Sequence, residues 1–237
     1  MKKLSKLLLG ILCVGTLAGC GGKKVERKGS IEEAIKGLEN LTSMTMELDM
    51  NMSVPSMDMN MEYEVLVKVD ENGNTYTEMT MFEETMKSYT IIKDGETCEI
   101  DYYTEEEMDE AGWYGSCYEY VEEEEEIPAV DSSMLEGYSD EDFEYKDGWY
   151  VLSDEKVSEI ESAMTEADLG EYGSFVDFSS AEDLEFKVQL ADGKLEKVRI
   201  SFSITQEGVK MNYELTLKLS KVNKTTIKAP SYKLIGE

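Results

Sequence analysis

The feature that most constrains the fold is a long alternation of apolar and polar residues near the start of the chain. From 44 to 54 every second residue is apolar, and after Pro55-Ser56 the alternation resumes from 57 to 69. Because successive side chains of a β-strand point to opposite faces, each segment predicts a strand with one buried face. The short turn between the segments predicts that the two strands pair as a hairpin.

The same period recurs along most of the chain. Shorter strands are expected at about 75–82, 86–93 and 96–103, and another within 143–152 after the turn at 146–148. Three long antiparallel strands are predicted at 184–190, 198–204 and 211–219, because Gly-containing turns separate them and each is apolar on one face. The acidic stretch 104–142 predicts loops with one helical turn.

Two helices are expected. Ser30 and Glu33 have the spacing of a capping box, and apolar residues at helical spacing follow, which predicts a helix at about 30–41. Ser153 caps a second helix, in the centre of the chain, whose apolar stripe includes Val157 and Ile160. Two helices cannot cover a flat sheet of this size, so the sheet must curl around them. The sequence predicts an α+β fold: a curved antiparallel sheet, an incomplete β-barrel of about nine to eleven strands, with both helices against its concave face.

The N-terminus carries a targeting signal. Lys2, Lys3 and Lys6 precede an apolar run from Leu7 to Leu17, and Ala18-Gly19-Cys20 follows. This pattern resembles the lipobox of bacterial lipoproteins. The resemblance implies that residues 1–19 are a signal peptide removed before Cys20, and that a diacylglyceryl group on the Cys20 thiol anchors the protein to the extracytoplasmic face of the cell membrane. A membrane-spanning anchor is the weaker interpretation, because the apolar run is far shorter than the ~20 residues of a spanning helix.

The charge balance restricts the partners. The chain has 23 basic and 52 acidic residues, and loss of Lys2, Lys3 and Lys6 leaves 20 basic residues and a formal charge of −32. Such a chain repels polyanions, which excludes nucleic acid as a partner. Residues 20–29 are the exception: four basic residues predict a lipidated tether that contacts an anionic leaflet.

The layout of residues 30–237 resembles the LolA-like lipoprotein carriers and the mycobacterial LppX/LprG lipoproteins, and the segment 225–230 is similar to the end of LolA-like lipoproteins of Gram-positive bacteria. The resemblance implies a half-barrel domain whose concave face holds a lipid or other apolar ligand, without catalysis. The alternative is that the same apolar side chains only fill a core. The residues expected to line a cavity are Met44, Met46, Leu48, Met50, Met52, Met59, Met61, Tyr63, Val65, Ile200, Phe202, Tyr213 and Leu215.

Two cysteines remain after Cys13 leaves with the signal peptide and Cys20 takes the lipid. Cys98 and Cys117 could form a disulfide outside the cytoplasm, or could stay as two reduced thiols.

Catalytic and metal chemistry receive little support. The chain has no histidine, which removes Ser-His-Asp, Cys-His and His-zinc sites, so we expect neither an enzyme nor a cofactor. Met57, Met59 and Met61 could bind Cu(I) through their thioethers, but they continue the apolar stripe of the hairpin. Acidic clusters at 105–110, 122–126 and 140–142 could bind Ca²⁺ weakly, although such runs are more often solvated loops.

A second function class stays open. The chain could be a cell-envelope adaptor that binds a protein partner through an acidic and aromatic surface or an exposed sheet edge. An adaptor would have a filled interior and an exposed aromatic patch, whereas a carrier would have a large apolar cavity. The aromatic residues of that patch would be Tyr102, Tyr103, Trp113, Tyr114, Tyr118 and Tyr120.

Overall fold

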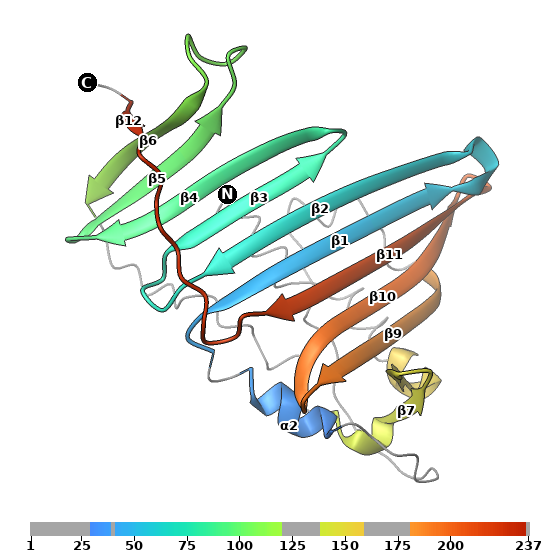
Figure 1. Ribbon diagram of the computed structural model, residues 1–237. Coiled ribbons are helices and arrows are strands. Elements are labelled where there is room, and N and C mark those ends of the chain that lie inside the picture. Colours follow the sequence, from blue (N-terminus) through green and yellow to red (C-terminus); the bar gives the residue numbers. More distant parts are fainter. Residues whose placement is uncertain (1–28, 39–40, 120–137, 159–180, 236–237) are drawn as a thin grey trace. The chain divides into compact units, whose positions relative to one another are not determined.

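A computed structural model of the chain describes residues 29–38, 41–119, 138–158 and 181–235 (Figure 1). The short helix α2 (Ile31–Lys36) precedes the strands. The strands are β1 (Met44–Val54), β2 (Met59–Val69), β3 (Thr75–Met81), β4 (Glu84–Lys93), β5 (Glu96–Tyr103), β6 (Gly112–Glu119), β7 (Phe143–Lys146), β8 (Trp149–Leu152), β9 (Ala181–Ala191), β10 (Lys194–Gln206), β11 (Val209–Ser220) and β12 (Lys233–Leu234).

These twelve strands form one sheet with the order β12-β6-β5-β4-β3-β2-β1-β11-β10-β9-β8-β7 (Figure 1). The order has two ends, β12 and β7, so the sheet is open and is not a closed barrel. The prediction of an open, mainly antiparallel sheet with few helices is confirmed. The strand count exceeds the predicted nine to eleven because 112–119 and 233–234 also pair and because 143–152, predicted as one strand, forms the two strands β7 and β8.

The chain divides into two compact units. The first contains α2, residues 50–61, strands β7 to β10 and β11 as far as Lys218. The second contains residues 41–49, strands β3 to β6, most of β2 and the C-terminal segment from 219.

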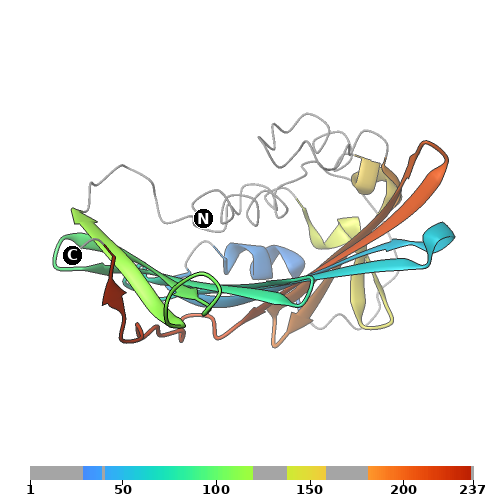
Figure 2. The ribbon, with the colours of Figure 1, turned by 90° about the horizontal axis from the view of Figure 1, so that it is seen from above.

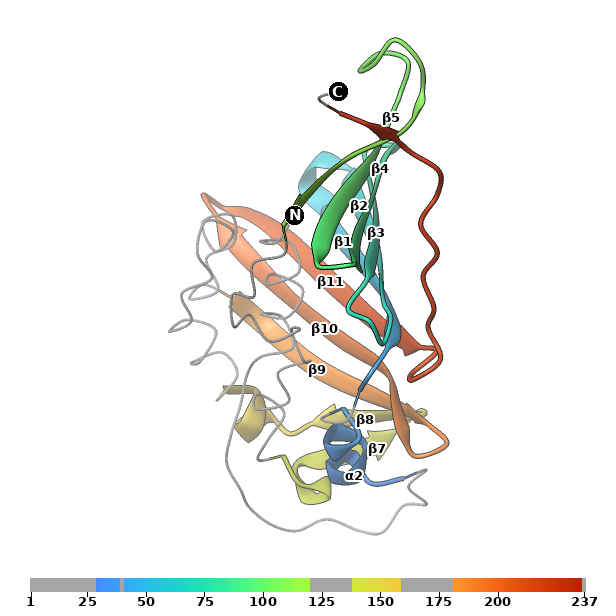
Figure 3. The same ribbon diagram turned by 90° about the vertical axis from the view of Figure 1, so that its left-hand side faces the viewer.

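In the first unit, β9, β10 and β11 form the long antiparallel meander that the sequence predicts. Every second residue of β10 from Val198 to Ile204 is buried, as the period-two pattern requires. Helix α2 contacts β10 and buries Ile31. The helix is tied to the region of the β7–β8 hairpin, since the Ile31 amide donates to Asp140 Oδ1 at 2.6 Å and the Tyr150 hydroxyl donates to the Gly29 carbonyl at 3.0 Å (Figure 3).

In the second unit, β2 to β6 form an antiparallel meander. Short turns join β2 to β5, and the longer segment 104–111 joins β5 to β6. The C-terminal segment 221–232 runs across one face of these strands and ends beside β6 (Figure 2). Thr225 fixes its start: the Thr225 amide donates to Ser43 Oγ at 3.1 Å, and the Thr225 and Thr45 hydroxyls are 3.0 Å apart. Thr45 is therefore buried, although the alternation of β1 predicts that it faces solvent.

Two predictions about local structure are wrong. Residues 112–119 form strand β6 where loops were expected, because Trp113, Tyr114 and Tyr118 favour extended backbone and β5 supplies a partner along the whole segment. The first helix ends at Lys36, five residues before the predicted end, with Gly37 as its C-cap. Residues 154–158 are helical, as predicted for the start of the central helix, and the remainder of that helix lies outside the described residues. None of the described helices is long and apolar enough to cross a membrane.

Candidate functional site

The predicted cavity residues of β10 and β11 lie on one face of the first unit. Ile200 is paired with Leu215 and Phe202 with Tyr213. The Phe202 and Tyr213 rings stack at a centroid distance of 4.9 Å and an interplanar angle of 11°. Ile200, Phe202 and Leu215 are buried, so this part of the set forms packed core in the structure.

The predicted residues of the N-terminal hairpin range from buried to exposed. Met44, Met46 and Leu48 at the start of β1 are buried, whereas Met50 and Met52 farther along are half-buried. On β2, Val65 is buried, Met61 and Tyr63 are half-buried, and Met59 is 38% exposed. Within the predicted set, the members nearer the hairpin turn are more exposed, although Val54 at the end of β1 is buried, so only those members are accessible to a ligand.

An apolar strip crosses the neighbouring strands of the second unit. The strip consists of Tyr63, Val65, Met79, Met81 and Met86, which the register places on one face: Tyr63 pairs with Met81, Val65 with Met79, and Met79 with Met86. Its inner end is buried at Val65 and its outer end is open at Met86, which is 51% exposed. The other three members, Tyr63, Met79 and Met81, are half-buried.

The turn beside the strip is strained. Phe82 and Glu83 both have positive φ angles, 52° and 69°, a conformation that favours glycine or asparagine and disfavours a bulky side chain. The Phe82 ring is 63% exposed and contacts the Tyr63 ring edge-on at 5.8 Å. The turn thus holds a large aromatic side chain beside Tyr63 of the strip.

The opposite face of the same strands carries a row of aromatic rings. Tyr76, Tyr89, Trp113 and Tyr102 contact one another in that order, with centroid distances of 4.6, 5.1 and 5.3 Å. Tyr76 is buried, its hydroxyl donates to Glu78, and burial together with Glu78 raises the pKa of Tyr76 far above its ordinary value. Burial also raises the pKa of Tyr89. The sequence analysis missed Tyr76 and Tyr89, although their aromatic character inside predicted strands was a usable signal.

The predicted aromatic patch is not a single surface. Tyr102 and Trp113 lie in the row on one face, whereas Tyr103, Tyr114 and Tyr118 alternate with them and lie on the other face. The Tyr118 hydroxyl donates to Glu99 at 2.8 Å, and burial together with this bond raises the pKa of Tyr118 to about 12. Tyr120 lies outside the described residues. The expectation that all six rings form one adaptor surface is therefore wrong for the five that are described.

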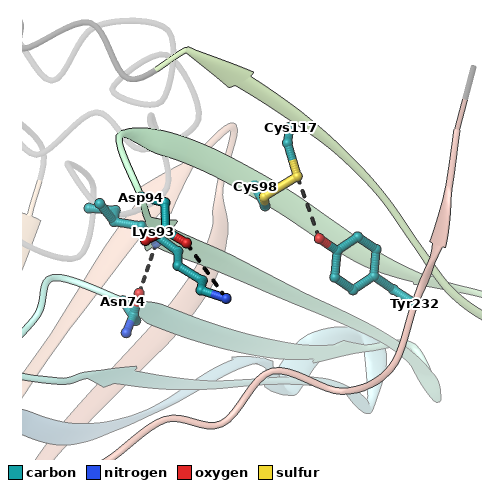
Figure 4. The surroundings of a disulfide bond; sticks show 7 residues. Asn74, Lys93, Asp94, Cys98, Cys117 and Tyr232 are labelled. Carbon is teal, nitrogen blue, oxygen red and sulfur yellow. Dashed lines mark hydrogen bonds and ion pairs between the residues drawn. A yellow bond between two sulfur atoms is a disulfide. The ribbon is translucent and has the colours of Figure 1, made fainter.

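Cys98 and Cys117 form a disulfide that joins β5 to β6 (Figure 4). They occupy directly opposed positions of the ladder. The Tyr232 hydroxyl, from the C-terminal segment, lies 3.5 Å from Cys117 Sγ (Figure 4). The sequence analysis missed Tyr232, since nothing in the local pattern connects it with a strand more than a hundred residues away.

In the described acidic clusters, 105–110 and 140–142, carboxylates accept hydrogen bonds from nearby Thr and Ser residues, and one carboxylate forms an ion pair with a lysine. Glu107 accepts from the amide and hydroxyl of Thr104, and these bonds lower its pKa. Asp142 accepts from the amide and hydroxyl of Ser139 in a capping box. Glu110 pairs with Lys233. Across the described ranges, no group of three or more His, Cys, Asp or Glu side chains could hold a metal ion, while cluster 122–126 lies outside those ranges. Cys20 and the tether 20–28 also lie outside them.

Comparisons with known proteins yield only remote structural likeness. No protein-family model and no curated protein matches the sequence. Among solved structures, a DUF1329 family protein from Desulfovibrio piger is similar at 7% identity, with 82% of this chain and 90% of that chain covered and a TM-score of 0.25. The ywiB protein from Bacillus subtilis is similar at 10% identity, with 75% of this chain and 92% of that chain covered and a TM-score of 0.18. At these scores neither protein contributes to an argument about function.

Proposed function

We propose that this chain is a bacterial lipoprotein, anchored through Cys20 to the extracytoplasmic face of the cell membrane, that binds a lipid or other apolar ligand without catalysis. The LolA-like layout and the lipobox support this proposal from the sequence. The observation that carries the ligand part is the apolar strip Tyr63, Val65, Met79, Met81 and Met86, which passes from a buried to an exposed end.

The composition of the strip suits a flexible apolar ligand. Three of its five members are methionines, whose unbranched thioethers adopt many rotamers and repack around chains of different shape. Each CH₂ group of an acyl chain that leaves water contributes about 0.8 kcal/mol, so a chain that covers several of these side chains gains several kcal/mol. Phe82, exposed on the strained turn, would contact the ligand beside Tyr63.

The first test is to purify the mature protein from a bacterial envelope fraction and analyse it by native mass spectrometry and lipid extraction. A lipid in stoichiometric amount supports the proposal and identifies the ligand class. A ligand-free protein would shift the interpretation to an adaptor without an apolar cargo.

The second test locates the ligand. Titration of the full chain with a fluorescent fatty acid should show that Met86→Gln weakens binding, because it places a polar amide at the open end of the strip. Lys87→Gln is the matched control, since Lys87 is the next residue along β4 and lies on the opposite face, paired with Glu78. Equal affinity of the two variants would contradict the placement of the ligand on the strip.

The anchor is tested separately. Cys20→Ala should release the protein from membranes or leave the precursor uncut, as followed by cell fractionation and electrophoretic size. Unchanged membrane attachment and unchanged mature size would overturn the anchor.

A further inference from the structure

Within the part of the chain that the structure describes, one edge of strand β6 has few strand partners. On one side β6 pairs with β5 at every position from Gly112 to Glu119. On the other side, Tyr114 and Gly115 are the only β6 residues with partners among the described strands, and these partners are Lys233 and Leu234 of the two-residue strand β12. An edge of this length with free backbone groups is a template for a further strand.

The pairing with β5 shows which β6 residues direct their amide and carbonyl groups away from β5. The Cα atoms of Cys98 and Cys117 are 4.0 Å apart, a short spacing typical of the non-hydrogen-bonded pairs of an antiparallel ladder. Because the two pair types alternate, Gly115, Cys117 and Glu119 turn their amide and carbonyl groups away from β5. The Gly115 carbonyl accepts from the Ile235 amide at 2.9 Å, which agrees with this orientation. Among the described strands, none pairs with Cys117 or Glu119 on that side.

The C-terminal residues show which sequence fits the edge. Tyr232 lies on the disulfide side, and a Cβ added to Gly115 would approach its ring to 3.2 Å. Lys233 lies on the opposite side, where Nζ is 2.6 Å from Glu110 Oε2 and 5.5 Å from the centre of the Tyr114 ring. The edge therefore holds an aromatic, a basic and an aliphatic residue in succession.

The C-terminal residues 233–235 are held only weakly at the β6 edge. Leu234 and Ile235 are 49% and 48% exposed, and the pair between Lys233 and Glu110 is open to solvent. Exposed ion pairs stabilise weakly, and a strand of two residues forms few backbone hydrogen bonds. The C-terminal residues can thus leave the edge without unfolding the meander.

We propose that the β6 edge is a strand-addition site for an extended segment of a partner protein that carries an aromatic, a basic and an aliphatic residue in succession, and that the C-terminal residues of this chain occupy the site when the partner is absent. Charge favours a basic segment, because the face that receives Lys233 also carries Glu99, Asp101 and Glu110. Backbone pairing would supply affinity and the alternating side chains would supply selectivity. The proposal does not depend on the apolar ligand.

The test uses the full disulfide-bonded chain and fluorescent peptides of the sequence Ala-Pro-Ser-Tyr-Lys-Leu-Ile-Gly-Glu, which reproduces residues 229–237. Fluorescence anisotropy should show saturable binding. A peptide N-methylated at the isoleucine keeps every side chain but loses the amide that bonds to Gly115, and it should bind about fivefold to tenfold more weakly. A peptide with Glu in place of Lys should also bind several-fold more weakly, because its carboxylate faces Glu110.

A protein variant tests the competition with the chain's own C-terminus. Lys233→Glu places a carboxylate next to Glu110 and loosens β12, so the parent peptide should bind several-fold more tightly to it. Lys224→Glu makes the same charge change at an exposed position remote from β6 and should leave the affinity unchanged. Equal binding of the N-methylated and parent peptides, or no saturable binding to the Lys233→Glu variant, would overturn the proposal.

Discussion

Replacement of Gly115 by alanine should destabilise the protein strongly. An added Cβ would lie 2.8 Å from the Glu99 carbonyl oxygen, 3.0 Å from Ile100 Cγ1 and 3.2 Å from Tyr232 Cδ2. The first contact is with the backbone of β5, which cannot move without opening the ladder, so relief by a side-chain rotation is not available. Overpacking of this kind costs about 1–3 kcal/mol. We expect Gly115→Ala to lower the free energy of unfolding by about 2 kcal/mol, or to shift the urea midpoint by roughly 1 M.

Gly112→Ala is the matched control on the same strand. A Cβ at Gly112 meets only Tyr114 Cε2, at the ordinary contact distance of 3.9 Å. Because alanine loses less backbone entropy than glycine on folding, this variant should be as stable as the parent or more stable by up to ~1 kcal/mol. Urea unfolding followed by tryptophan fluorescence measures both variants. If Gly115→Ala unfolds within about 0.5 kcal/mol of Gly112→Ala, the packing argument is refuted.

The remaining predictions concern the disulfide, one tyrosine and the anchor. Because Cys98 and Cys117 close a loop with a sequence separation of 19, reduction should lower the unfolding free energy by about 3 kcal/mol, and a double alanine variant should not respond to reductant. Alkylation without reductant should label neither cysteine. Burial and Glu99 raise the pKa of Tyr118 from 10.0 to about 12, so the stability it contributes is complete below pH 10 and is lost from pH 10 to about pH 12. Absorbance titration should show that Glu99→Gln returns this pKa toward 10.0, whereas an unchanged titration curve would contradict the role of Glu99. Cys20→Ala should release the protein from membranes or leave the precursor uncut, as fractionation and electrophoretic size will show.

Much of the sheet was predictable because its strands are defined by local alternation. The three strands of the C-terminal third follow the predicted turns, and β3, β4 and β5 lie within two residues of the predicted bounds. For the C-terminal strands and for β4 and β5, a period of two coincides with a short Gly-containing turn, and the two signals together specify both strand and register. The turn between β3 and β4 is Phe82-Glu83 and contains no glycine.

Strand β6 and its partner β12 were not predictable in the same way. Trp113, Tyr114 and Tyr118 count as apolar in a binary pattern, yet they stand on both faces of β6, so no alternation is visible. Strand β12 has two residues, too few to show any period, and its partner lies more than a hundred residues earlier in the chain. Pairings of this kind depend on tertiary position and leave no local signal.

The sequence pattern assigns one face of the sheet to apolar residues and the other to solvent, but the β2–β5 meander has large apolar or aromatic side chains on both faces. One face carries the apolar strip, and the other carries the aromatic row that contains Tyr76 and Tyr89. The C-terminal segment covers part of a face that the alternation assigns to solvent, as the burial of Thr45 shows. The proposed ligand lies on the strip, whereas the proposed peptide pairs with the β6 edge. Met86→Gln should therefore alter fatty-acid binding without altering peptide binding, and Lys233→Glu should do the reverse.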